Sequence, residues 1–241
     1  MERYIKNINF SEIGVEGQKI LCSSSVVIIG AGGLGSNFAN HFVRAGFGRV
    51  RIIDKDKVEL SNLQRQWLYD EEDIGKYKAQ AAFSRLSKVN SEVKIEAVVS
   101  EFNNSNAEDL VRDFDIVMDA TDNFKTRFLI DDICFKLRKP WVFTGILGAE
   151  AQTMLIIPGV TPTLKEFMDD IGTNCTELQH VEPDVSSSVL SPSVSIISSI
   201  AVLTALKFLI KKDPQPGALI TFDTWNNKLR VWPGKRARSG L

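Results

Sequence analysis

The sequence is poor in cysteine. Only Cys22, Cys134 and Cys175 occur among 241 residues, and no two of them form a Cys-x-x-Cys pair. Structural zinc sites are built largely from such pairs, and disulfide-stabilised folds need a denser, even set of cysteines. The sequence therefore predicts neither a cysteine-based zinc site nor a disulfide framework.

The sequence also lacks an excess of charge of either sign. It has 29 lysines and arginines against 30 acidic residues, which gives a net charge of −1. Nucleic acids and anionic membranes attract proteins that carry a positive excess. The longest apolar run, residues 194–210, is interrupted by serines, as in a buried helix. The first ten residues lack the apolar core of a signal peptide. We therefore expect a cytoplasmic protein that binds neither nucleic acid nor membrane.

What the chain has instead is a regular alternation of apolar β-branched runs and amphipathic segments. Strands are predicted within 24–30, 50–54, 93–100 and 115–121, and helices within 37–48, 76–90, 106–114 and 123–139. Such alternation predicts an α/β fold with a mostly parallel sheet. Strands at 141–148 and 151–159 follow each other directly, so the sheet is expected to continue with antiparallel strands.

We expect residues 1–241 to form a single domain with two parts. Residues 1–145 are the nucleotide-binding half, and residues 146–241 carry the antiparallel strands. The second half is expected to hold a structureless crossover at about 162–191, a helix at 192–211 and a terminal hairpin. Structureless segments of that length inside a compact domain are commonly functional.

Glycines mark the first junction between strand and helix. Gly30, Gly32, Gly33 and Gly35 lie in the run GAGGLG, and Asp54 closes the next predicted strand. Glycines allow a tight turn and a close approach to phosphate at a helix N-terminus, and a carboxylate so placed accepts hydrogen bonds from ribose hydroxyls. The pattern predicts a bound nucleotide, for which an NAD-dependent oxidoreductase is the default interpretation.

A second polar group favours a triphosphate instead. Ser61, Asn62 and Arg65 lie in the run SNLQRQ, and Lys78 ends the run GKYK. Neutral donors and two cations suit the higher charge of a triphosphate and the charge that develops when one of its phosphorus atoms reacts.

A third group, the run DATDN at 119–123, follows a predicted strand at the edge where α/β sheets bind ligands. Mg²⁺ prefers one or two carboxylates together with phosphate oxygens and waters. We assign this ion to Asp122, and we expect Asp119 to cap or orient the loop.

In this order and spacing, GAGGLGS, D-x-D-x-V-E-L-S-N-L-Q-R-Q, G-x-x-K and DATDN resemble the motifs of the E1-like adenylating family. That family includes the activators of ubiquitin-like sulfur carriers in the molybdopterin and thiamine pathways. The resemblance covers nearly the whole chain. It implies a Rossmann-like ATP-binding domain with a mixed sheet and an adenylyltransferase that uses ATP and Mg²⁺ to activate a carboxylate as an acyl-adenylate.

The resemblance also implies roles for individual residues. The glycines and Asp54 would face the nucleotide, Asp122 would hold Mg²⁺, and three residues would stabilise the α-phosphate: Asn62, Arg65 and Lys78. Family members are homodimers or pseudo-dimers in which an N-terminal arginine reaches the partner's ATP. The matching position here is Lys6, with Arg3 close by.

The chain departs from the family at its cysteines. Thr163 and Glu166 stand where a zinc-binding Cys-x-x-Cys pair is usual, and Asp184 stands where sulfur-carrier activators keep a crossover cysteine. Cys175, with His180 as a candidate partner, is the one other thiol in that segment, and Ser186, Ser187 and Ser188 are candidates for polar lining. A separate acceptor protein is therefore expected to take the activated acyl group.

Two substrate classes remain open. Because the zinc and crossover cysteines are missing together, we favour a small-molecule carboxylate, as in the family member that activates guanylylpyridinol for [Fe]-hydrogenase cofactor synthesis. The alternative substrate is the C-terminal glycine of a ubiquitin-like sulfur carrier. A non-catalytic nucleotide-binding scaffold is a further alternative, but such a scaffold has no need of Asn62, Arg65, Lys78 and Asp122.

Overall fold

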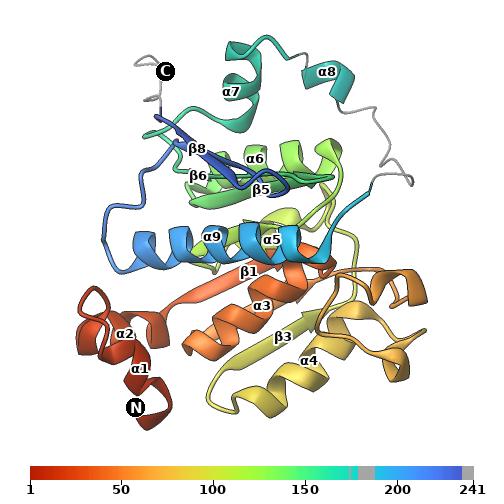
Figure 1. Ribbon diagram of the computed structural model, residues 1–241, viewed down its shortest axis with the longest axis vertical. Helices are drawn as coiled ribbons and strands as arrows, with labels where there is room; N and C mark the ends of the chain where they lie inside the picture. Colours follow the sequence, from red (N-terminus) through yellow and green to blue (C-terminus); the bar gives the residue numbers. More distant parts are fainter. Residues whose placement is uncertain (174, 179–187, 235–241) are drawn as a thin grey trace.

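In the computed structural model, which describes residues 1–173, 175–178 and 188–234, one mixed sheet crosses the molecule (Figure 1). Its strand order is β3-β2-β1-β4-β5-β6-β7-β8. The strands are β1 (Ser25–Ile29), β2 (Arg49–Ile53), β3 (Lys94–Val98), β4 (Ile116–Asp119), β5 (Trp141–Leu147), β6 (Glu150–Ile156), β7 (Leu219–Asp223) and β8 (Lys228–Trp232). The neighbours in β3-β2-β1-β4-β5 pair in parallel, and the neighbours in β5-β6-β7-β8 pair antiparallel. This arrangement confirms the predicted fold class.

Helices cover both faces of the sheet. The longer ones are α2 (Gly14–Ser23), α3 (Gly33–Ala45), α4 (Lys78–Val89), α6 (Phe124–Leu137) and α9 (Ser191–Leu209), and the shorter ones are α1 (Ile5–Ile8), α5 (Ala107–Val111), α7 (Leu164–Asp170) and α8 (Cys175–Leu178). Side chains alternate across a strand, so Val26 and Ile28 pack with α3, α4 and α9, whereas Val27 and Ile29 pack with α5 and α6. Burial of both faces explains why the parallel strands are continuous apolar runs.

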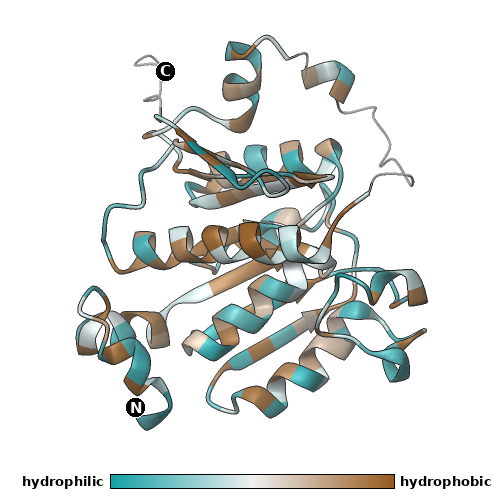
Figure 2. Ribbon diagram, in the orientation of Figure 1, coloured by the Kyte–Doolittle hydropathy of each residue, from teal (hydrophilic) through white to brown (hydrophobic). Residues whose placement is uncertain are grey.

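Helix α9 is apolar around most of its circumference (Figure 2). Among the described helices it is the one whose length and composition would suit a membrane span, with a mean hydropathy of 1.7 over its window. It packs instead against α3, β5 and β6. Val194, Ile197 and Ala201 are fully or almost fully buried in that contact. The packing explains the apolar residues on the inner side of the predicted buried helix, whereas Ile196 and Leu203 on α9 are exposed.

The prediction of a structureless crossover at 162–191 is wrong for its first part. Helix α7 begins at a capping box, in which the Thr163 hydroxyl accepts from the Glu166 N–H and the Glu166 carboxylate accepts from the Thr163 N–H. This box satisfies backbone donors that the helix itself cannot pair. Buried Leu164 and Met168 then hold the helix against α6. Thr163 and Glu166 have the spacing of a capping box, which is the signal in the sequence for this helix start.

The N-terminal helices were also not predicted. Helices α1 and α2 precede β1 and lie beside its beginning, at the lower left of Figure 1. Tyr4 anchors them: its hydroxyl donates to Glu92 and accepts from Asn90. The chain's first residues are therefore fixed at the sheet edge opposite the carboxyl ends of the parallel strands.

Candidate functional site

The glycine loop joins β1 to α3 and requires glycine at two positions. Gly30 has a φ of +97°, and a Cβ atom there would lie 2.6 Å from the Ala120 carbonyl oxygen. A Cβ atom on Gly35 would lie 1.9 Å from the Gly30 carbonyl oxygen. A side chain at Gly30 would push the loop away from Ala120, and a side chain at Gly35 would push α3 away from the loop. The loop is therefore held against the segment that follows β4.

Asp54 lies beside this loop, at the end of β2. Its Oδ2 accepts from the Ala31 N–H at 2.6 Å and its Oδ1 from the Asp56 N–H at 2.7 Å. Burial raises the pKa of the Asp54 carboxyl, while the hydrogen bond from Ala31 and the charge of Lys78 act in the opposite direction. The carboxylate is thus fixed between the glycine loop and the segment that leads to Lys78, in the position expected of a ribose ligand.

Residues 60–69 cover the glycine loop. Asn62 is buried, and its side chain accepts from the Glu59 N–H at 3.2 Å, which closes a short 3₁₀ turn. Arg65 donates to the Ser61 carbonyl oxygen at 3.1 Å, and its Cγ lies 3.6 Å from the Cβ position of Gly33. The Tyr69 hydroxyl donates to the Ala31 carbonyl oxygen at 2.8 Å. These contacts place one predicted cation over the start of α3.

Lys78 is the first residue of α4, and it is buried. Its ammonium lies 3.4 Å from the Asp56 carboxylate, and its charge opposes the rise in the pKa of Asp54. Among the described residues this buried ammonium has one ion-pair partner, the exposed Asp56, so it is a strong positive source in a region of low dielectric. Arg65 and Lys78 therefore border the glycine loop and Asp54.

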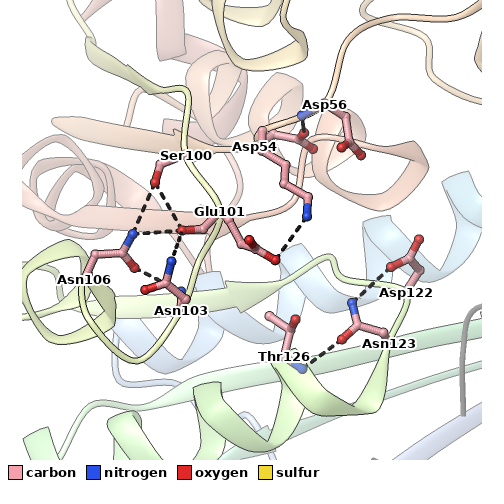
Figure 3. A network of polar contacts seen from close by, with 10 residues as sticks. Asp54, Asp56, Ser100, Glu101, Asn103, Asn106, Asp122, Asn123 and Thr126 are labelled. Carbon is pink, nitrogen blue, oxygen red and sulfur yellow. Dashed lines mark hydrogen bonds and ion pairs between the residues drawn. The ribbon is translucent and has the colours of Figure 1, made fainter. Parts of the chain in front are cut away.

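Asp122 lies on the neighbouring loop after β4, next to the segment that contacts Gly30. Its exposed carboxylate accepts from the Asn123 side chain at 3.3 Å, and Asn123 caps α6 by accepting from the Thr126 N–H at 2.9 Å. Figure 3 shows Asp122 and Asn123 across from Asp54 and Asp56. Since this is the one hydrogen bond of the Asp122 carboxylate within the described residues, the carboxylate has lone pairs left for a cation.

Asp119 is fully buried and orients the loop. Its Oδ1 accepts from both the N–H and the hydroxyl of Thr121, and its Oδ2 accepts from Arg127. Burial raises the pKa of the Asp119 carboxyl, and the Arg127 charge opposes this rise. Arg127 was not singled out from the sequence, because a lone arginine inside a helical segment gives no signal of its partners.

Lys6 and Arg3 lie apart from these residues. The Arg3 guanidinium donates to the Val89 carbonyl oxygen at 3.0 Å, at the C-terminal end of α4, and Lys6 is exposed on α1. Both belong to the N-terminal helices at the opposite edge of the sheet. The structure brings the glycines, Asp54 and the residues after them together, but it does not bring Lys6 to its own chain's glycine loop.

The crossover thiol has no feature of an activated nucleophile. Cys175 Sγ lies 3.7 Å from the Lys165 carbonyl oxygen, and burial, with a hydrogen bond to Asp169, raises the pKa of the thiol. Thiolate nucleophiles need a lowered pKa. Asp184, His180, Ser186 and Ser187 lie outside the described residues. Ser188 is described, and its carbonyl oxygen accepts from the Gly148 N–H at 2.8 Å.

Within residues 1–173, 175–178 and 188–234, no group of three or more His, Cys, Asp or Glu side chains could hold a metal ion. Thr163 and Glu166 stand where the resemblance implies a zinc-binding pair. In this structure they form the capping box of α7.

The ThiF family model matches residues 4–240. The chain belongs to the ThiF family. It is 38% identical over 231 residues to the sulfur carrier protein ThiS adenylyltransferase of Bacillus subtilis, which covers 94% of this chain and 66% of that protein. It is 35% identical over 236 residues to the sulfur carrier protein adenylyltransferase of Thermus thermophilus, which covers 95% and 86%. The chain spans about half the length of relatives named adenylyltransferase and sulfurtransferase MOCS3.

Solved structures agree in fold. A crystal structure of Escherichia coli MccB with ATP has a TM-score of 0.84 at 23% identity and covers 99% of this chain and 73% of that one. The structure of PaaA has a TM-score of 0.78 at 26% identity and covers 95% and 81%. The predicted resemblance to the E1-like family is confirmed, and two of the relatives are named adenylyltransferases of sulfur carrier proteins.

Proposed function

We propose that the chain adenylates the C-terminal carboxylate of a small ubiquitin-like sulfur carrier protein, consuming ATP and releasing pyrophosphate. Two relatives at 38% and 35% identity are named as adenylyltransferases of sulfur carrier proteins. The observation that carries the proposal is the placement of Arg65 and Lys78 beside the glycine loop and Asp54. That arrangement matches the charge of a triphosphate at the binding edge of the sheet.

The reaction needs positioning and charge neutralisation more than a general base, because a carboxylate is already nucleophilic at neutral pH. The carrier's carboxylate oxygen attacks the α-phosphorus, and the bond from that phosphorus to the bridging oxygen breaks to release pyrophosphate. Asn62, Arg65 and Lys78 hold the α-phosphate and stabilise the charge that develops on its oxygens. Asp54 fixes the ribose and so the direction of attack.

The residues present also fit Mg²⁺. Asp122 offers a solvent-facing carboxylate that accepts from the neutral amide of Asn123 at 3.3 Å, and a hard cation of this kind takes one or two carboxylates plus phosphate oxygens. Bound Mg²⁺ would neutralise phosphate charge and stabilise the leaving pyrophosphate. Asp122 is its proposed ligand.

The active protein is proposed to be a homodimer. Lys6 is exposed on α1, which lies beside the beginning of β1 (Figure 1), so its proposed role is at the nucleotide of a second subunit. Lysine keeps the positive charge of the arginine usual at this position but loses its bidentate geometry.

The acyl-adenylate is proposed to pass to a separate acceptor. The described thiol of the crossover, Cys175, has a raised pKa, and the position where relatives keep a cysteine is Asp184. A carboxylate cannot form the thioester or persulfide that a cysteine would. This chain therefore activates the substrate, and another protein accepts it.

A small-molecule carboxylate, such as a pyridinol cofactor precursor, is the second candidate substrate. The observation in its favour is that α7 begins at a Thr163–Glu166 capping box instead of a zinc-binding pair, together with Asp184 at the cysteine position. The names of the relatives favour the carrier protein over this substrate.

ATP–pyrophosphate exchange tests the proposal directly. The purified chain with Mg²⁺ and radiolabelled pyrophosphate should form labelled ATP when a carrier ending in Gly-Gly is added. The same carrier lacking its last glycine is the control. Exchange with a guanylylpyridinol and no carrier would show that the substrate is the small-molecule carboxylate and not the carrier protein. Calorimetry with ATP·Mg²⁺ and with NAD separates the adenylyltransferase from an oxidoreductase, and ATP binding without exchange for any carboxylate would indicate a scaffold.

A further inference from the structure

The Asp119–Arg127 ion pair is the most deeply buried one among the described residues. Asp119 is fully buried and the Arg127 side chain is 9% exposed, with Nε and Oδ2 3.2 Å apart. Burying two charges is costly, and such pairs contribute little net stability compared with apolar residues of similar shape. The pair therefore needs a reason other than stability.

Arg127 contacts three elements with one rigid group. Besides Asp119 on β4, its Nη2 donates to the Thr121 carbonyl oxygen at 2.8 Å and to the Thr144 carbonyl oxygen of β5 at 3.2 Å. The guanidinium also lies over the rings of Phe124 and Phe143. A planar guanidinium presents its donors in a fixed fork, which a lysine ammonium lacks.

Thr121 is held from both sides by this pair. Its N–H and hydroxyl donate to Asp119 at 2.9 and 2.6 Å, and its carbonyl oxygen accepts from Arg127. The Thr121 carbonyl belongs to the peptide unit whose nitrogen is that of Asp122, and a peptide unit is planar. Asp119 and Arg127 together therefore hold the peptide unit from which Asp122 extends.

We infer that Arg127 is a positioning residue for adenylation, one that acts by fixing the peptide before Asp122. Arg127 itself is buried, and its guanidinium donates to Asp119, Thr121 and Thr144. This inference rests on the proposed function, in which Asp122 is the Mg²⁺ ligand. It predicts that a change at Arg127 affects the contribution of Mg²⁺ to nucleotide binding, and not nucleotide binding in general.

Arg127→Lys is the first variant for the test, because it keeps the charge that Asp119 needs and loses the fork. Arg51→Lys is the matched control. Arg51 makes the same kinds of contact, with the Glu96 carboxylate at 2.8 Å and the Leu110 carbonyl oxygen at 2.8 Å, and it is 15% exposed, but it lies on β2 away from the loop. Thermal unfolding of both variants gives the purely structural cost of each substitution.

Calorimetric titration of a non-hydrolysable ATP analogue, with Mg²⁺ and with EDTA, gives the decisive readout. We expect the gain in affinity that Mg²⁺ gives the wild type to fall about 10-fold or more in Arg127→Lys, since small displacements of a ligand are costly. Affinity in EDTA should stay within about 2-fold of wild type, and Arg51→Lys should match wild type in both buffers. The exchange rate should fall in parallel with the Mg²⁺-dependent gain.

An unchanged Mg²⁺-dependent gain in Arg127→Lys would overturn the inference, as would equal losses with and without Mg²⁺. Should that variant fail to fold, the double variant Asp119→Asn, Arg127→Met removes both buried charges at once, and the same titration decides. A wild-type protein that binds no ATP analogue would instead refute the proposed function, so the two failures are distinguishable.

Discussion

The indole N–H of Trp67 donates to the Ser191 hydroxyl at 2.7 Å. This bond joins the segment that carries Arg65 to the first turn of α9, where the crossover returns to the domain. A second, longer contact runs from the Gln64 amide to the Val189 carbonyl oxygen at 3.4 Å. The segment that carries Arg65 is therefore tied to Val189 and to the first turn of α9.

This link predicts non-additive variants. Trp67→Phe and Ser191→Ala each remove the same hydrogen bond, which is worth about 1 kcal/mol. The double variant should cost no more than either single one in unfolding free energy and in exchange rate, with a coupling energy of about 1 kcal/mol. Trp225→Phe is the control, because Trp225 is even more exposed, at 75%. Fully additive losses would show that the bond does not couple the two segments.

Lys78→Met should abolish most of the activity. Loss of one preorganised charge contact to the reacting phosphate costs on the order of 10²–10³ in rate. Lys76→Met is the matched control, since Lys76 is two residues away, is exposed and pairs with Asp73 at 3.0 Å. Pyrophosphate exchange measures both variants. Equal losses in the two would mean that the effect of Lys78 is not local to the site.

A mixture of two inactive variants tests whether Lys6 acts on the partner's site. Lys6→Ala and Lys78→Met should each be nearly inactive alone. If Lys6 reaches the other subunit, a mixed dimer holds one complete site, and an equimolar mixture refolded together should regain about a quarter of the wild-type exchange rate. If Lys6 acted within its own chain, no dimer in the mixture would hold a complete site, and the activity would stay at the level of the single variants.

Asp131 should make stability depend on pH. The side chain is 2% exposed, its Oδ2 accepts from the Lys165 N–H at 3.2 Å, and burial raises the pKa of the carboxyl to about 6. The folded protein therefore binds this proton more tightly than the unfolded chain does. The contribution of the group to stability is fully present below about pH 4 and is lost as the pH rises through 6.

Asp131→Asn removes that titration. When the pH rises from 4.5 to 7.5, the unfolding free energy of the variant should rise by about 2 kcal/mol relative to that of the wild type. Urea unfolding at the two pH values measures the difference, and other titrating groups cancel in the comparison. A difference between the two proteins that is the same at both pH values would contradict the raised pKa.

The beginning of α7 should be independent of metal. Thr163→Ala removes one side of the capping box and should lower the unfolding free energy by about 1 kcal/mol, measured by urea unfolding. Incubation with a chelator, in the absence of nucleotide, should leave the melting temperature unchanged. A fall in melting temperature together with one equivalent of released zinc would contradict the assignment of this segment.

Part of the candidate site can be predicted from the sequence, because those residues are placed by local sequence patterns. Gly30 and Asp54 belong to a strand-turn-helix pattern whose spacing alone places them together, and SNLQRQ adds a charge pattern that distinguishes a triphosphate. The contacts of Arg127 with Asp119 and Thr144 could not be predicted in this way. They depend on how β5 pairs with β4, which is a matter of tertiary packing. The contacts of Tyr4 with Asn90 and Glu92, which fix the N-terminal helices, could not be predicted either. These partners lie 86 and 88 residues further along the chain.

Helix α9 also constrains the order in which the chain folds during synthesis. It covers β5 and β6, yet it is made after both of them, and β7 and β8 follow it. Until residue 209 has left the ribosome, one face of those strands has no apolar cover. A fragment that ends before Ser191 would leave that face exposed, whereas the chain through Trp232 can bury it, so the last fifth of the sequence covers an apolar face made by the residues before it.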